Sequence, residues 1–356
     1  MKKIYIIAAA ALALAACSKT EVFAPVAGEI DFAPNALSTK ALIEAGEFPT
    51  DQTFSVFAFA DLDGTGSDYT TDYTSPVMND VEISYHTVGT SGDWKAKQGT
   101  YLWPATGTVD FYAYYPSTLT ATFDVSSNHK HLELSGVNLG NAIGQQNEPL
   151  VASILGQMRQ RVQLVFKHTV SQIAVTAFDA TETAALQGKL SIKKVEFVNM
   201  KTTGRYVDGT TSGAGEWLEV NGSSSFVPFQ GNKKLETTEN YLSNNSFSNS
   251  FDGSAAFVVI PEDIINDVTT GQAIKVTYSY PAFSWNDFDY PAAEETVIVP
   301  LYGRVSSFDN GKRYVFHLGI SMDGANNEIM FSPSVDGWET IDVSGITIDA
   351  LNVDLL

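Results

Sequence analysis

Short stretches in which apolar and polar side chains alternate run along most of the chain. They are rich in Val, Ile, Phe, Tyr and Thr, and clusters of Gly, Asn, Asp, Ser and Pro separate them. A period of two residues places successive side chains on opposite faces of an extended strand. The alternation predicts strands at residues 53–59, 109–115, 161–168, 170–178, 189–198, 255–260, 273–280, 296–301 and 312–318.

Helical periodicity is scarce, with one or two turns expected at most in residues 181–187 and 261–266. Many short strands joined by polar connections favour an all-β protein built from β-sandwiches. The Ala-rich segment 180–188 is the predicted linker, because strand alternation resumes at residue 189. We therefore expect an N-terminal domain over residues 41–186 and a C-terminal domain over residues 187–356. Residues 209–222 and 236–253 are predicted to be long surface loops.

The first 16 residues have the order of a secretory signal peptide. Lys2 and Lys3 come first, followed by a short apolar stretch and then by small residues. Cys17 follows directly, in an arrangement similar to a bacterial lipobox, where the cysteine is acylated (with palmitate, for instance) and becomes the new N-terminus. The apolar stretch is too short to span a membrane as a helix. We expect the precursor to be exported and held at a membrane by its lipid.

Composition narrows the range of functions. The chain has 356 residues, of which 44% are hydrophobic and 17% charged, as in a folded protein. Its formal net charge of −20 repels phosphate backbones and anionic lipid head groups, so we expect no nucleic-acid partner and no basic membrane patch. Because Cys17 is the only cysteine, no disulfide can form within the chain.

Motifs that carry chemistry are weak. The five histidines lack zinc-protease spacing, and neither a nucleophile elbow nor a phosphate-binding loop is present, so we predict no enzyme activity, no catalytic residue and no cofactor. Asp61, Asp63 and Asp68 lie close together and offer the oxygen ligands that calcium prefers. Their spacing is not that of an EF-hand, and an acidic turn is the simpler interpretation. The aromatic cluster at residues 285–290 has two interpretations, a sugar-stacking surface or a loop that packs an aromatic ring onto the core.

Several motifs, taken in order, resemble the fimbrillin family of Bacteroidetes. The resemblance rests on the lipobox ending at Cys17, a β-like segment at residues 29–32, and a basic residue in Thr39-Lys40-Ala41. It continues through Phe54-Ser55-Val56-Phe57-Ala58-Phe59, Tyr101-Leu102-Trp103-Pro104, residues 109–116, 149–153 and 165–173, and residues 311–318 followed by Trp338. The resemblance implies two tandem transthyretin-like β-sandwich domains and a subunit of lipoprotein-derived pili.

The same resemblance implies a route of assembly. The precursor would be displayed at the outer membrane, and a protease would cut after Lys40 so that the mature chain begins at Ala41. Residues 17–40 would then be a propeptide, and the strand around Ile30 and Phe32 would leave its sheet. A strand from another subunit would fill the vacated groove by β-augmentation.

The C-terminus offers a candidate donor strand at residues 345–356. Its apolar side chains alternate, with Ile346, Ile348 and Ala350 on one face and Leu351, Val353 and Leu355 on the other. Each of these side chains stabilises by roughly 1.5–3 kcal/mol when fully buried. The segment could instead pair with its own domain as a last strand. Whether the chain takes a stalk, tip or anchor position is left open.

Two hypotheses follow for function. The first is a structural subunit of surface fimbriae that serves cell adhesion, with other fimbrial subunits as partners. The second is a monomeric surface lipoprotein that binds glycans through the aromatic residues Trp285 to Tyr290.

Overall fold

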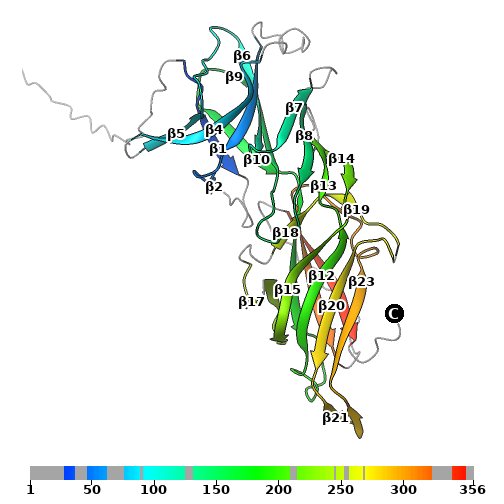
Figure 1. Ribbon diagram of the computed structural model, residues 1–356. Coiled ribbons are helices and arrows are strands. Elements are labelled where there is room, and N and C mark those ends of the chain that lie inside the picture. Colours follow the sequence, from blue (N-terminus) through cyan, green and yellow to red (C-terminus); the bar gives the residue numbers. More distant parts are fainter. Residues whose placement is uncertain are drawn as a thin grey trace, which may run out of the picture.

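The computed structural model describes residues 28–36, 46–61, 76–88, 91–124, 131–208, 215–243, 246–251, 256–267, 269–322 and 339–349. The described residues form strands, turns and irregular segments, with no α-helix among them, so the all-β prediction is confirmed. Residues 184–188 form a turn in which Gln187 N–H donates to the Thr183 carbonyl at 3.2 Å, and residues 262–263 form a short strand. The strands form an N-terminal group at one end and a longer C-terminal sandwich below it (Figure 1).

An eight-stranded sheet forms the N-terminal group, in the order β10-β9-β6-β3-β4-β5-β1-β2. Because β1 also pairs with β10, this sheet closes on itself. Its strands are β1 (Phe32–Ala36), β2 (Gly46–Glu47), β3 (Phe54–Asp61), β4 (Met78–Val88), β5 (Ser91–Ala96), β6 (Thr108–Tyr115), β9 (Leu150–Gln157) and β10 (Val162–His168).

A small second sheet covers the outer face of β3 and β6, in the order β14-β13-β8-β7. Its strands are β7 (Thr120–Asp124), β8 (His131–Asn138), β13 (Thr203–Val207) and β14 (Glu216–Asn221). Phe54 and Val56 of β3 belong to the core inside the closed sheet, whereas Phe57 and Phe59 belong to the core shared with Leu134 on β8. A strand between two cores is apolar on both faces, which explains why β3 is buried along its whole length.

The C-terminal sandwich packs a six-stranded sheet against a four-stranded sheet. The first contains β11 (Ser171–Asp179), β16 (Asn240–Ser243), β17 (Ser246–Ser248), β18 (Ala256–Val259), β25 (Lys312–Ser321) and β26 (Glu339–Asp349). The second contains β12 (Ser191–Met200), β15 (Ser224–Lys234), β20 (Ala273–Tyr280) and β23 (Ala293–Pro300). Their inner faces share one core, in which Phe197 packs edge to face against Phe257 and Phe316.

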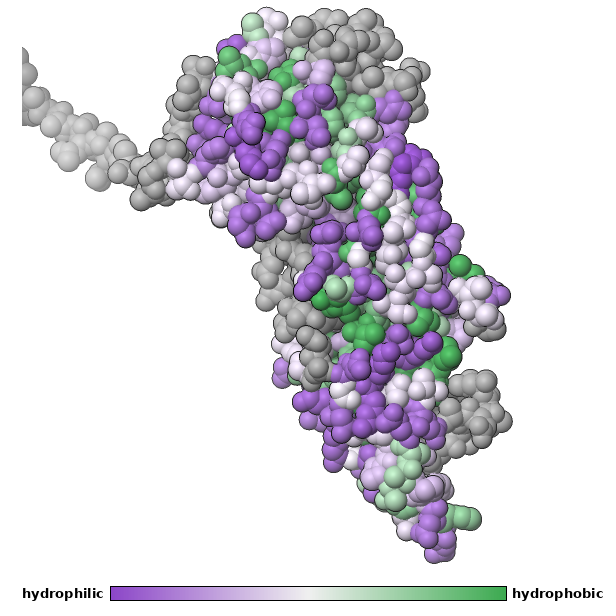
Figure 2. All heavy atoms as spheres, in the orientation of Figure 1, coloured by the Kyte–Doolittle hydropathy of each residue, from purple (hydrophilic) through white to green (hydrophobic). Residues whose placement is uncertain are grey.

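Two short pairs complete the described strands. They are β19 (Glu262–Asp263) with β24 (Ser307–Phe308), and the hairpin of β21 (Phe283–Trp285) with β22 (Phe288–Tyr290). The hairpin lies at the end of the sandwich remote from β1 (Figure 1). On the face shown in Figure 2, hydrophilic side chains cover much of the surface and apolar ones are interspersed among them.

Strand pairing crosses the predicted boundary at residue 186 in both directions. β11 precedes that residue but pairs with β25 and β18 of the C-terminal sandwich. β13 follows it but pairs with β8 of the N-terminal group. The chain therefore enters the C-terminal sandwich near Val170 and returns once to the N-terminal group. The division into two tandem transthyretin-like domains stays a prediction.

Two predicted loops contain strands. β14 lies within residues 209–222, and β16 and β17 lie within residues 236–253, so the loop prediction was wrong there. The error has a physical reason. These strands are short and lie toward sheet edges, where polar side chains are tolerated and the alternation of apolar residues is weak.

Candidate functional site: the position of the first strand

β1 closes the N-terminal sheet. It runs parallel to β10, with Phe32 opposite Val162 and Ala36 opposite Phe166 as Cα partners. Toward β5 its pairing is limited to Phe32 and Trp94. Just before the strand, Val162 N–H donates to the Asp31 carbonyl at 2.9 Å. Removal of β1 would therefore open the sheet between β5 and β10.

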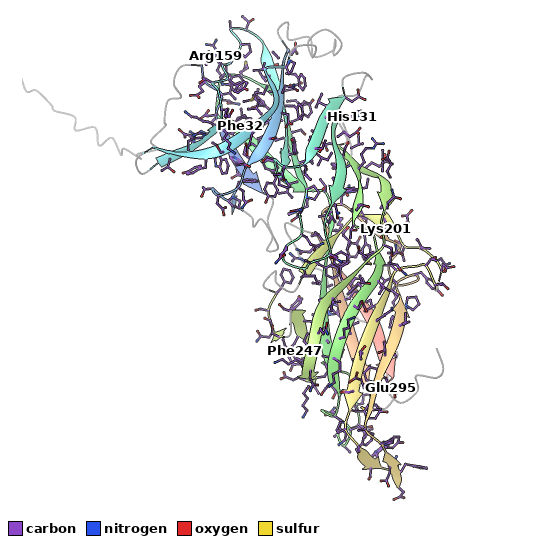
Figure 3. All side chains as sticks on the ribbon, viewed as in Figure 1. Phe32, His131, Arg159, Lys201, Phe247 and Glu295 are labelled. Carbon is purple, nitrogen blue, oxygen red and sulfur yellow. The ribbon has the colours of Figure 1, made fainter. Side chains whose placement is uncertain are left out.

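The side chains of Ile30 and Phe32 point into the core. Ile30 and Phe32 are 2% and 1% exposed, and Phe32 lies within the N-terminal group (Figure 3). The Phe32 ring packs edge to face against Phe54 and Phe111, with centroid distances of 6.0 and 5.7 Å. If the first strand leaves, these rings lose their packing partner and the vacated position is lined by apolar side chains.

Ion pairs stabilise the residues directly before β1. Arg161 donates from Nε to Asp31 Oδ2 at 2.8 Å and from Nη2 to Asp93 Oδ1 at 2.5 Å. Burial alone would lower the pKa of the Arg161 guanidinium, but its hydrogen bonds and charge interactions with Asp31 and Asp93 outweigh that and raise the pKa. Lys95 forms a further pair with Glu29 at 3.1 Å. The segment is therefore held by charges at its start as well as by its core side chains.

The end of β1 leads into the predicted cleavage site. Ala36 and Gly46 are antiparallel Cα partners, so residues 37–45 connect β1 to β2 in a hairpin arrangement. Lys40 and Ala41 belong to that connection and lie outside the described residues, as does the predicted lipid site Cys17. Pro34, in the middle of β1, has no N–H to donate to a neighbouring strand.

At the other end of the chain, β26 is the last strand of the six-stranded sheet. It runs parallel to β25, with Ile346 opposite Leu318 and Ile348 opposite Ile320. This part of the candidate donor segment pairs with its own domain in the structure, the alternative that the sequence left open. The other four candidate donor residues, Ala350, Leu351, Val353 and Leu355, lie outside the described residues.

The remaining sequence candidates are separate from this site. Asp61 lies at the end of β3 and is largely buried, while Asp63 and Asp68 lie outside the described residues. No group of three or more His, Cys, Asp or Glu side chains in the described part of the chain is arranged to hold a metal ion. In that same part, no helix has the length and apolar character needed to cross a membrane.

The aromatic cluster forms the protruding β21–β22 hairpin. Phe283 and Tyr290 stack with centroids 4.7 Å apart, and Phe283 and Trp285 pack onto the C-terminal core. Phe288 at the turn is 68% exposed. Part of the cluster therefore covers the core, as the second interpretation expects, while sugar stacking by the exposed ring stays a prediction.

Sequence reasoning missed the side chains that hold β1 at its start. Arg161 and Asp31 are separated by 130 positions, and no local pattern joins them. Asp93 was also missed, since it lies in β5, a strand that the alternation did not predict. The available signal was the position of Arg161 directly before a strongly alternating strand, which by itself indicates only a strand end.

The chain is similar to known fimbrial proteins. The fimbrillin-like family model matches residues 39–338. A fimbrial protein from Bacteroides vulgatus is similar in fold, with a TM-score of 0.51 and 14% identity over 86% of this chain and 99% of that protein. A fimbrial assembly protein from Parabacteroides distasonis matches with a TM-score of 0.36 and 12% identity over 81% of this chain and 90% of that one. Among curated protein sequences, none matches.

Proposed function

Because the chain belongs to the fimbrillin-like family, we propose that it is a structural subunit of surface fimbriae that serves cell adhesion. We further propose that its subunits assemble by strand exchange after proteolysis at Lys40–Ala41. The observation that carries the proposal is the position of β1, which closes the N-terminal sheet and ends at the connection that contains the predicted cut.

Departure of β1 creates the driving force for assembly. Ile30 and Phe32 each stabilise the uncut chain by roughly 1.5–3 kcal/mol through burial. Without them, β10 presents unpaired backbone groups beside an apolar groove, which is the arrangement that accepts an added strand. The same contacts keep β1 in place before cleavage, so an uncut subunit stays monomeric.

Cleavage is the trigger in this proposal. A cut after Lys40 removes the covalent connection between β1 and β2, so that only non-covalent contacts hold β1. The released segment includes Cys17, and with it the lipid that anchors the precursor at the outer membrane. Maturation would thereby free the subunit from the membrane and open its groove in one step.

The C-terminal segment is the proposed donor. Among the described strands, β26 lies at the edge of its sheet and pairs with β25, so its transfer to another subunit would break one strand pairing. Ile346 and Ile348 lie two positions apart in the sequence, and this period predicts one shared face, as a groove-filling strand requires. The donor residues would be Ile346, Ile348, Ala350, Leu351, Val353 and Leu355.

A reversible cross-link tests the exchange. Ala33 of β1 and Gln163 of β10 are partners on the outer face of the sheet, at a spacing that a disulfide spans. In a Cys17→Ser background, Ala33→Cys with Gln163→Cys should allow cleavage after Lys40 but block detergent-resistant multimers until a reductant is added. Multimers that form equally well while the cross-link is intact would contradict the proposal.

The matched control places a disulfide far from β1. Thr277 and Thr296 are partners on β20 and β23, with their hydroxyl oxygens 2.8 Å apart. Thr277→Cys with Thr296→Cys in the same background should cross-link the chain without affecting multimer formation. A block by this control would show that any disulfide disturbs assembly.

A second candidate function rests on the exposed Phe288 ring. In this alternative the chain remains a monomeric surface lipoprotein, and the β21–β22 hairpin stacks against sugar rings. Binding on a glycan array that disappears in both Phe288→Ala and Trp285→Ala would support it. An array that is blank for the unmodified protein would count against it.

A further inference from the structure

A cavity of about 530 Å³ lies where β6 ends and where β3 and β9 begin, and it has no role in the proposed assembly. Three segments line it: Pro49 and residues 51–53 before β3, residues 115–118 at the end of β6, and residues 146–148 before β9. β10 connects the cavity wall to β1. Phe166 of β10 is the Cα partner of Ala36 in β1, and His168 lies two residues further along β10. His168 Nδ1 lies 2.5 Å from Glu148 Oε1 in the cavity wall.

Glu148 has an unusual environment for a carboxylate. The residue is 2% exposed, and while Oε1 contacts His168, Oε2 is buried without a hydrogen-bond partner among the described residues. A buried carboxylate oxygen without a donor is costly, so its retention suggests that a donor arrives from outside the chain.

Several polar side chains of the cavity wall bond to other groups of the chain. Tyr115 Oη donates to Gln52 Oε1 at 3.1 Å, and the hydroxyls of Thr53 and Ser117 lie 2.6 Å apart. Gln146 donates to the Val258 carbonyl at 2.7 Å and accepts from the Val258 N–H at 2.7 Å. These pairings hold the wall in place and occupy the donors of Tyr115 and Gln146.

The cavity is also electronegative. Burial raises the pKa of the Tyr115 hydroxyl, and the negative charges of Glu148 and Asp51 raise it further. Both carboxylates therefore contribute negative potential at the Tyr115 hydroxyl. Lys97 lies near the rim but pairs with Glu82 at 2.9 Å, and Ser117 donates to that glutamate at 3.4 Å. No lysine or arginine is among the residues that line the cavity.

We infer that this cavity binds an organic cation through a primary ammonium or guanidinium group, with Glu148 Oε2 and the Asp51 carboxylate as its acceptors. Such a group brings several N–H donors and a positive charge, which match the unpartnered oxygen and the two carboxylates. Two carboxylates fall short of the six to eight oxygen ligands that calcium takes. The rings of Pro49, Tyr115 and Pro116 supply apolar surface for the carbon chain attached to the cation. The inference is independent of strand exchange.

Calorimetric titration of the full chain tests the site with n-butylammonium and n-butylguanidinium as probes and 1-butanol as the neutral comparison. We expect saturable binding of the cations, weakened about tenfold by Asp51→Asn and by Glu148→Gln. Glu294→Gln, which removes an exposed charge elsewhere, should leave affinity unchanged. Asp51 is exposed, so its variant is informative even if Glu148→Gln fails to fold.

Three results would overturn the inference. Equal binding of 1-butanol would show that the cavity selects carbon chains and not charge. Full displacement of the organic probes by an equal concentration of sodium or potassium would indicate a site for inorganic cations. Absence of saturable binding, or affinity that Asp51→Asn leaves unchanged, would show that the carboxylates form no such site.

Discussion

Arg161 donates from Nε to Asp31 Oδ2 across 2.8 Å and so joins the start of β10 to the start of β1. The Asp31 side chain is 6% exposed, whereas that of Arg161 is 37% exposed. The carboxylate thus depends on this guanidinium for its charge partner, and the guanidinium remains within reach of solvent. The pair marks the edge at which β1 would begin to separate from the sheet.

Replacement of Arg161 should loosen this edge. Arg161→Ala leaves the buried Asp31 carboxylate without its charged donor, and we expect a loss of about 1–3 kcal/mol in the free energy of unfolding of the uncut chain. Urea denaturation measures the change. Lys97→Ala, which removes the exposed pair with Glu82, should cost only about 0–1 kcal/mol. Equal losses in the two variants would contradict the role given to Arg161.

The Phe32 ring should account for much of the attachment of β1. Phe32→Ala removes a side chain that packs against Phe54 and Phe111, so we expect a loss of about 3–5 kcal/mol in the free energy of unfolding. Hydrogen exchange should be faster in β10 of the uncut variant. The control Phe288→Ala removes an exposed ring and should change stability by less than about 0.5 kcal/mol. Unchanged protection of β10 in Phe32→Ala would argue against β1 as the closing strand.

Glu262 should make stability depend on pH. Burial raises the pKa of this carboxyl from 4.5 to about 7 in the folded chain, so the folded state binds more protons than the unfolded state between these values. The contribution of Glu262 to stability is therefore greatest below about pH 4.5, and it falls as the pH rises to about 7.

Glu262→Gln removes this titration and should stabilise the chain relative to the unmodified protein above pH 7, by on the order of 2 kcal/mol. The difference should shrink toward pH 4.5. Thermal or urea unfolding of both proteins at pH 5 and pH 8 gives the comparison, with Glu294→Gln, at an exposed position, as the control. A difference that is the same at both pH values would show that Glu262 does not titrate abnormally.

Deletion of residues 346–356 tests the donor segment. Because β26 is an edge strand, we expect the shortened chain to retain β25 and the rest of its sandwich core. After cleavage at Lys40 it should still expose its groove but form no detergent-resistant multimers. Mixing it with the full-length cut protein should produce chains that end at the shortened subunit. Normal multimers of the deletion variant alone would exclude the donor assignment.

The sequence predicted the strands that alternate strongly. Residues 162–168 and 273–280 are strands in the structure because their apolar side chains face a core at every second position. Residues 53–59 and 109–115 were also predicted as strands, although burial on both of their faces depends on a second core layer that no local pattern reveals.

Local sequence patterns did not predict which distant segments pair with each other. β1 finds its partner β10 about 130 residues away, and β13 returns to β8 after the chain has entered the other sandwich. Register and sheet order depend on such non-local contacts, which the period of hydrophobic residues does not encode. The candidate segment around Ile30 and Phe32 was predicted from family resemblance, whereas its ion pair with Arg161 and the cavity at Glu148 needed the structure.

In the proposed function, proteolysis removes β1 and so permits assembly. Mass spectrometry of the native N-terminus, compared between sheared surface material and the outer-membrane pellet, tests it most directly. We expect that subunits in the sheared material begin at Ala41 and that the segment with Ile30 and Phe32 is absent from them. Fibres whose subunits begin at an acylated Cys17 and still carry β1 would contradict it.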